Sequence, residues 1–191
     1  MAVSKGQEQA KLKSLLEIEH NSFGENRLQE ATFKWRDIKI NNIKLHYIGA
    51  LQSKKVKEIY NHFNVIETLD TEKSAEKIAA CNVKNLKTEV PKIYIQINIG
   101  KENQKRGVLP SDFEKFLKMC REKYKLKISG AMCLPPQTND PSKYFKLMQE
   151  LCLKYNIHDI SMGMSNDYIN AIEYGSTNIR IGSLIFGKRK Y

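Results

Sequence analysis

The chain has 191 residues, of which 41% are hydrophobic and 28% are charged, the make-up of one ordinary globular domain. No apolar run approaches the roughly 18 residues that a membrane-spanning helix needs, and the first residues carry no hydrophobic signal-peptide core, so we expect a soluble, cytoplasmic protein. The four cysteines lie far apart with no CxxC pair, so their spacing suggests reduced core residues rather than a zinc site or a disulfide framework. The net charge of +11 attracts anions, but the lysines are scattered, which indicates a solvated basic surface rather than a nucleic-acid footprint.

Short apolar and β-branched runs recur along the chain, and each is followed by a stretch with helical periodicity. The expected strands are Ala2–Ser4, Ser22–Gly24, Leu45–Gly49, Val65–Leu69, Ile93–Ile99, Lys127–Leu134, Asp159–Met164 and Asn178–Ser183. The expected helices are Gln7–Ile18, Asn26–Phe33, Ser53–Phe63, Thr71–Ala80, Ser111–Tyr124, Pro141–Tyr155 and Asn166–Tyr174. Eight strands that alternate with helices predict one (β/α)8 TIM barrel over residues 1–191, in the α/β class; an open doubly wound sheet is the alternative.

The fifth strand and the helix after it show the two periods most clearly. Isoleucines alternate with polar residues along Ile93–Ile99, so they share one face of the strand. Ser111 and Glu114, which follow Pro110, form a capping-box pattern ahead of apolar residues at helical spacing. The sequence therefore predicts a helix that begins at this pair.

In the last two strands, polar and small residues fall at the alternate positions that point into the predicted barrel, which we call the inner phase. Arg180 and Gly182 share that phase in the eighth strand, and Ser161 and Gly163 share it in the seventh. An arginine, small residues and a serine near the carboxyl ends of such strands are typical of a phosphate cradle, with Ser165 as the N-cap of the next helix. The alternative is that both glycines serve packing and that the arginine makes a structural ion pair.

Seven sequence blocks occur in one order and spacing almost from end to end of the chain. They are AVSK (2–5), FGEN with LQE (23–30), HYIGALQSKKV (46–56), QINIGKENQKRG (96–107), GAMCLPP (130–136), SMGMSNDY (161–168) and GSTNIRIGSLIFG (175–187). In this combination the chain resembles the pyridoxal phosphate homeostasis proteins, also called the YggS or PROSC family, which are related to the amino-terminal barrel of alanine racemase. The resemblance implies a barrel of the alanine racemase N-terminal type, pyridoxal phosphate fold type III.

The resemblance implies that Lys5 forms a Schiff base with pyridoxal 5′-phosphate (PLP). A lysine at the end of the first strand projects into the opening of the barrel, from which water is excluded, and burial there favours the neutral amine that forms an imine. Without the flanking block, a solvated lysine near a terminus is the alternative.

The resemblance also implies a site for the cofactor phosphate. Ser161 and Ser165 would hold it together with the backbone amides around Gly182 and Ser183, and Gly163 belongs to the same cradle. These residues coincide with the phosphate cradle that the strand phase predicts.

Further residues are implied to surround the cofactor ring. Arg180 would face the pyridine nitrogen, and because a guanidinium does not accept a proton, the ring would stay a weak electron sink. Asn26 would neighbour the ring hydroxyl, and His46 would contribute to the wall, although a packed strand histidine is equally compatible. Lys105 is expected to be solvated rather than catalytic.

The function that the resemblance implies is to bind PLP and to buffer or deliver it in vitamin B6 homeostasis, with effects on amino-acid and keto-acid balance. Racemases of this barrel type take a second base from a carboxyl-terminal domain across a dimer, and we expect no such domain after Tyr191. A weak electron sink without an opposed acid/base pair favours a carrier without efficient catalysis, whose recipients are PLP-dependent apoenzymes. A slow PLP-dependent racemase or lyase, with Tyr94, His46 or Cys133 as the base, is the main alternative, and a basic nucleic-acid-binding module is a third.

The family usually carries a helix before the first strand, whereas this chain enters that strand at once. We therefore expect the early edge of the barrel to be poorly covered and the position of Lys5 to be less secure. A monomer is expected.

Overall fold

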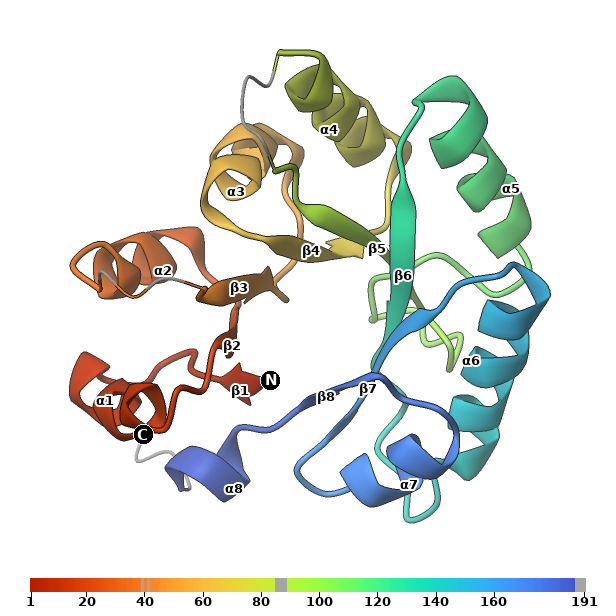
Figure 1. Cartoon of the computed structure of the whole chain (residues 1–191). Coiled ribbons are helices and arrows are strands. Elements are labelled where there is room, and N and C mark those ends of the chain that lie inside the picture. Colours follow the sequence, from red (N-terminus) through yellow and green to blue (C-terminus); the bar gives the residue numbers. More distant parts are fainter. Residues whose placement is uncertain (39, 41, 85–88, 188–191) are drawn as a thin grey trace.

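The computed structural model describes residues 1–38, 40, 42–84 and 89–187. Eight parallel strands pair in chain order, and each is followed by a helical segment (Figure 1). The strands are β1 (Ala2–Val3), β2 (Ser22–Glu25), β3 (Lys44–Tyr47), β4 (Val65–Leu69), β5 (Lys92–Ile97), β6 (Ile128–Cys133), β7 (Asp159–Met164) and β8 (Asn178–Arg180). The helices are α1 (Gln9–Glu17), α2 (Leu28–Trp35), η1 (Ser53–Lys55), α3 (Val56–His62), α4 (Glu72–Lys84), α5 (Phe113–Lys118), η2 (Met119–Lys123), α6 (Ser142–Lys154), α7 (Tyr168–Glu173) and α8 (Ser183–Phe186).

The ring of strands is closed by hydrogen bonds between β1 and the chain that follows β8. The Val3 amide donates to the Ile181 carbonyl at 2.7 Å, and the Ile181 amide donates to the Met1 carbonyl at 3.0 Å. Because every strand pairs with its neighbours in sequence and the first meets the last, the architecture is a (β/α)8 barrel. This confirms the predicted fold and excludes the open doubly wound sheet.

Both faces of the fifth strand are buried from Ile93 to Ile97. Ile93, Ile95 and Ile97 of β5 are at most 3% exposed and belong to the apolar layer between strands and helices. Tyr94 and Gln96 alternate with them, and both are buried as well. Such continuous burial is expected for a parallel sheet that helices cover on its outer face.

The segment that leads out of β5 differs from the prediction. The helix begins at Phe113 with Asp112 as its N-cap, so the predicted capping box of Ser111 and Glu114 is wrong. The carboxylate of Glu114 instead accepts a hydrogen bond from the Tyr155 hydroxyl at 2.7 Å. A tertiary contact has therefore replaced the local one.

The first strand is better covered than expected. Ala2 is fully buried and Val3 is 7% exposed, because the segment after β8 lies alongside them. The expectation of a poorly covered early edge is therefore wrong for the described residues.

The described residues also bear on the membrane and the cysteines. No helix within them is both long and apolar enough to cross a membrane. No disulfide joins any of the four cysteines, all of which lie in the described part of the chain; Cys120, Cys133 and Cys152 are buried, whereas Cys81 is partly exposed. The three buried thiols match the prediction of reduced core residues.

Candidate functional site

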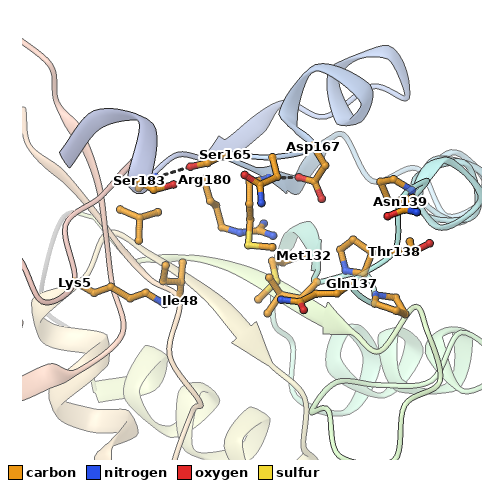
Figure 2. A pocket seen from close by; sticks show the side chains of 18 of the residues that line it. Lys5, Ile48, Met132, Gln137, Thr138, Asn139, Ser165, Asp167, Arg180 and Ser183 are labelled. Carbon is orange, nitrogen blue, oxygen red and sulfur yellow. Dashed lines mark hydrogen bonds between the residues drawn. The ribbon is translucent and has the colours of Figure 1, made fainter. Parts of the chain in front are cut away.

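A cavity of about 1070 Å³ lies at the carboxyl ends of the strands. Its wall combines residues next to β1, the loop 134–141 after β6, the turn 164–167 after β7, and the segment after β8 (Figure 2). This is the face on which (β/α)8 barrels carry their functional groups, because the loops that follow the strands converge there.

Lys5 enters this cavity from the first strand. β1 ends at Val3, Lys5 lies in the turn two residues further on, and both residues line the cavity. The side chain of Lys5 extends beside Ile48 into the open space, and Arg180 comes from another part of the wall (Figure 2). The geometry therefore places an amine and a guanidinium around one cavity, as the sequence predicted.

Arg180 is held firmly although it lines the cavity. Its side chain is 5% exposed, with Nη1 donating to the Ser161 hydroxyl at 2.7 Å and Nη2 donating to the Cys133 carbonyl at 2.8 Å. Both partners are uncharged, so these contacts do not support the alternative of a structural ion pair. The remaining N–H groups of the guanidinium are the donors that Arg180 can offer to a ligand in the cavity.

Three further predicted residues meet near Arg180. The Gly182 amide donates to the Ser165 hydroxyl at 3.4 Å, which joins the turn after β7 to the segment after β8. A Cβ atom at Gly182 would lie 3.7 Å from its nearest neighbours, so crowding does not require a glycine there. β8 ends at Arg180 and Ser183 begins α8, so the predicted strand is three residues too long.

Two predictions for the turn after β7 are wrong. α7 begins at Tyr168 with Asp167 as its N-cap, and the Asp167 carboxylate accepts a hydrogen bond from the Met164 amide at 2.6 Å, so Ser165 is not the cap. Gly163 is buried at a φ of +91°, and a Cβ atom there would lie 2.6 Å from the Cβ of Ala171. The Cβ direction of Gly163 faces α7 and not the barrel interior, so its predicted inner position is wrong and packing accounts for the glycine, while its contact with the cofactor stays a prediction.

Ser161 and His46 point inward but are bound to Glu67 of β4, a residue that the sequence analysis missed. The Ser161 hydroxyl donates to Glu67 Oε2 at 2.6 Å, and His46 Nδ1 lies 2.7 Å from Glu67 Oε1. The side-chain amide of Asn178 donates to the same Oε1 at 3.0 Å. Ser161 and Glu67 are fully buried, and together these residues form a polar network inside the barrel. A lone carboxylate in the apolar run Val65–Leu69 was the signal that could have revealed it.

The cavity thus gathers five of the nine predicted cofactor residues. Among the described residues that line it are Lys5, Ser165, Arg180, Gly182 and Ser183. The other four lie outside this lining: Asn26, His46, Ser161 and Gly163. Loop residues Gln137, Thr138 and Asn139 line the cavity without having been predicted, since loop 134–141 has no strand phase to follow.

Burial also changes the acid–base character of two groups considered as catalytic bases. Complete burial raises the pKa of the Cys133 thiol to about 12. Burial, together with the nearby Asp159 carboxylate that accepts a hydrogen bond from its hydroxyl at 3.0 Å, raises the pKa of Tyr94 far above its usual value. Neither group is an effective proton acceptor near neutral pH.

Comparison with known proteins agrees with this geometry. The family model described as alanine racemase, N-terminal domain, matches residues 1–190, so the barrel is of that class. A pyridoxal phosphate homeostasis protein of Aquifex aeolicus (strain VF5) is 37% identical over 88% of this chain and 77% of its own length. One of Pasteurella multocida (strain Pm70) is 33% identical over 100% of this chain and 86% of its own length. The chain therefore belongs to the pyridoxal phosphate homeostasis proteins.

A solved structure supports the same assignment. PipY of Synechococcus elongatus PCC7942, with PLP bound, is 28% identical, with a TM-score of 0.86 over 98% of this chain and 91% of that chain. The same protein without PLP has a TM-score of 0.87.

Proposed function

We propose that this protein binds PLP covalently through Lys5 and buffers or delivers it. The observation that carries the proposal is that Lys5, Arg180 and a pair of serines, Ser165 and Ser183, line one cavity at the carboxyl ends of the strands. Its relatives are named pyridoxal phosphate homeostasis proteins, and the related PipY has been solved with PLP bound.

The residues present fit this cofactor. The hydroxyls of Ser165 and Ser183 would hold its phosphate, next to Gly182, whose amide donates to the Ser165 hydroxyl at 3.4 Å. Arg180 would face the pyridine nitrogen as a donor, since a guanidinium has no acceptor to offer. The volume of about 1070 Å³ is slightly above the usual range of small-molecule sites and leaves room beyond the cofactor.

When bound, PLP supplies an aldehyde that reacts with amines. The Lys5 amine would condense with that aldehyde, so that a carbon–nitrogen double bond replaces the carbonyl and one water leaves. Arg180 would not protonate the ring nitrogen, and it would therefore keep the ring from withdrawing electrons strongly.

We infer that the protein holds and hands over PLP rather than turning over substrates. His46, one of the bases considered, is bound to Glu67 outside the cavity lining, and burial raises the pKa values of Tyr94 and Cys133. Racemisation needs groups that exchange protons at neutral pH on the reacting carbon. PLP-dependent apoenzymes as recipients, a cytoplasmic location and a monomeric state remain predictions.

The test is the visible absorption spectrum of the protein with and without PLP. The wild-type protein should show a Schiff-base band that borohydride abolishes, with one PLP fixed to Lys5 by mass spectrometry. The Lys5→Ala variant should lack both. An unchanged band in this variant, or label on another side chain, would remove Lys5 from the proposed role.

A second experiment separates the carrier from the enzyme. The PLP-loaded protein is incubated with α-deuterated amino acids, and loss of deuterium is followed. Exchange should be negligible, and exchange at about 1 s⁻¹ or faster, within the range of ordinary enzymes, would overturn the carrier interpretation.

A further inference from the structure

A buried cluster of charges lies between β2 and α2, and we call it the Lys34 clamp. Its members are Lys34 and Glu30 of α2 and Glu25 of β2. The Lys34 ammonium lies 2.8 Å from Glu25 Oε1 and 2.9 Å from Glu30 Oε1. Lys34 is 5% exposed and Glu25 is fully buried, so water does not screen this pair.

The clamp contacts both neighbours of Lys5. On one side, the Lys34 ammonium donates to the Ser4 carbonyl at 2.6 Å, and the Ser4 hydroxyl donates to Glu25 Oε1 at 2.7 Å. On the other side, the Gly6 amide donates to Glu30 Oε1 at 2.5 Å. The backbone is thus anchored before and after Lys5, whose side chain extends into the cavity (Figure 2).

The clamp also accounts for the turn that follows Lys5. Gly6 has a φ of +68°, a conformation that costs little only for glycine. The amide of Gly6 is the group that Glu30 accepts from, so this carboxylate holds the turn. Burial acts to raise the pKa of Glu30, but the hydrogen bonds from Lys34 and Gly6 outweigh it and lower the pKa below its ordinary value.

The donors of Lys34 are fully used. An ammonium group has three N–H bonds, and the Ser4 carbonyl, Glu25 Oε1 and Glu30 Oε1 accept one each. Apolar side chains of similar size would pack β2 against α2 without the cost of burying charges. A requirement for packing alone therefore does not explain why these three side chains are charged.

We propose that Lys34 is a positioning residue. Through Glu25, Glu30 and its own bond to Ser4, it fixes the backbone around Lys5 so that the Lys5 amine meets the aldehyde carbon of bound PLP. The proposal rests on the proposed function of Lys5. A displacement of about 1 Å can slow a reaction between positioned groups about a hundredfold. We therefore expect formation of the imine to depend on the clamp far more than the phosphate and ring contacts do.

The experiment compares two ligands on two variants. PLP forms the imine, whereas pyridoxine 5′-phosphate carries an alcohol in place of the aldehyde and reports on the phosphate and ring contacts alone. In Lys34→Met and in Glu30→Ala, the dissociation constant of PLP, measured from the Schiff-base band, should rise about tenfold or more. The dissociation constant of pyridoxine 5′-phosphate, measured by calorimetry, should change by less than about twofold.

Matched controls come from an exposed ion pair. Lys118 and Glu122 lie 4.0 Å apart with side chains 69% and 66% exposed, and Lys118→Met and Glu122→Ala should leave both constants unchanged. Should Lys34→Met fail to fold, Glu30→Ala decides, because the Glu30 side chain is 28% exposed and its removal leaves the Lys34–Glu25 pair in place.

The possible outcomes are distinct. An equal loss of affinity for both ligands, or a PLP affinity within about twofold of wild type in Glu30→Ala, would overturn the positioning role of Lys34. The proposed Schiff base at Lys5 would be unaffected by either result. A wild-type protein without a Lys5 imine would instead overturn the proposed function, and the positioning role with it.

Discussion

Replacement of Glu67 by glutamine tests whether the network inside the barrel stabilises the fold. Three side-chain donors converge on this carboxylate: His46 Nδ1 at 2.7 Å, the Ser161 hydroxyl at 2.6 Å and Asn178 Nδ2 at 3.0 Å. Glutamine has nearly the same shape, so the variant changes charge and hydrogen-bonding capacity without opening a cavity. The expected effect is therefore electrostatic.

The magnitude follows from what an amide can accept. Its oxygen can keep His46 and the Asn178 side chain, but as neutral bonds, and its NH₂ group can donate to the second lone pair of the Ser161 hydroxyl, whose own proton then loses the carboxylate acceptor. A hydrogen bond to a charged group contributes about 1.5–3 kcal/mol and a neutral one about 1 kcal/mol. Three bonds that each weaken by about 1 kcal/mol should lower the free energy of unfolding by about 3 kcal/mol.

The assay is urea unfolding without added cofactor. With a slope of about 2 kcal/mol per molar urea, the midpoint should fall by about 1–2 M at an unchanged slope. Glu122→Gln, which alters an exposed ion pair, should shift the free energy by less than about 0.5 kcal/mol. A Glu67→Gln midpoint that coincides with that of Glu122→Gln would refute the reasoning.

Three further predictions concern packing, thiols and ligand linkage. Gly163→Ala should destabilise the protein by about 1–3 kcal/mol more than Gly175→Ala in thermal unfolding. Both glycines have positive φ, but only Gly163 lacks room for a Cβ atom. Equal losses of stability in the two variants would contradict this. Because burial raises the pKa values of Cys120, Cys133 and Cys152 to about 12, no more than one of the four thiols should react rapidly with a disulfide reagent at pH 8, against four after unfolding. PLP at about 100 times its dissociation constant should stabilise the fold by about 2.7 kcal/mol, and identical melting temperatures with and without it would exclude specific binding.

The sequence by itself determined the class of fold and the family. The alternation of short β-branched runs with helical periods predicted the barrel, because strand and helix periods differ and each run was long enough to show one of them. The inner phase of Arg180 and Gly182 followed from the period of two along a strand, and both line the cavity. The seven blocks, in their order and spacing along the chain, predicted the family, which the comparisons confirm.

Only the tertiary structure decided how far along the barrel each inward side chain lies. Phase correctly placed Ser161 inside and the resemblance put His46 in the wall, but neither gives their height along the barrel, which depends on the stagger between strands far apart in sequence. That stagger brings both residues to Glu67, 94 and 21 positions away, instead of to the cavity lining. The Lys34 clamp depends in the same way on Ser4, 30 residues earlier in the chain, because hydrogen bonds between distant residues leave no local pattern in the sequence.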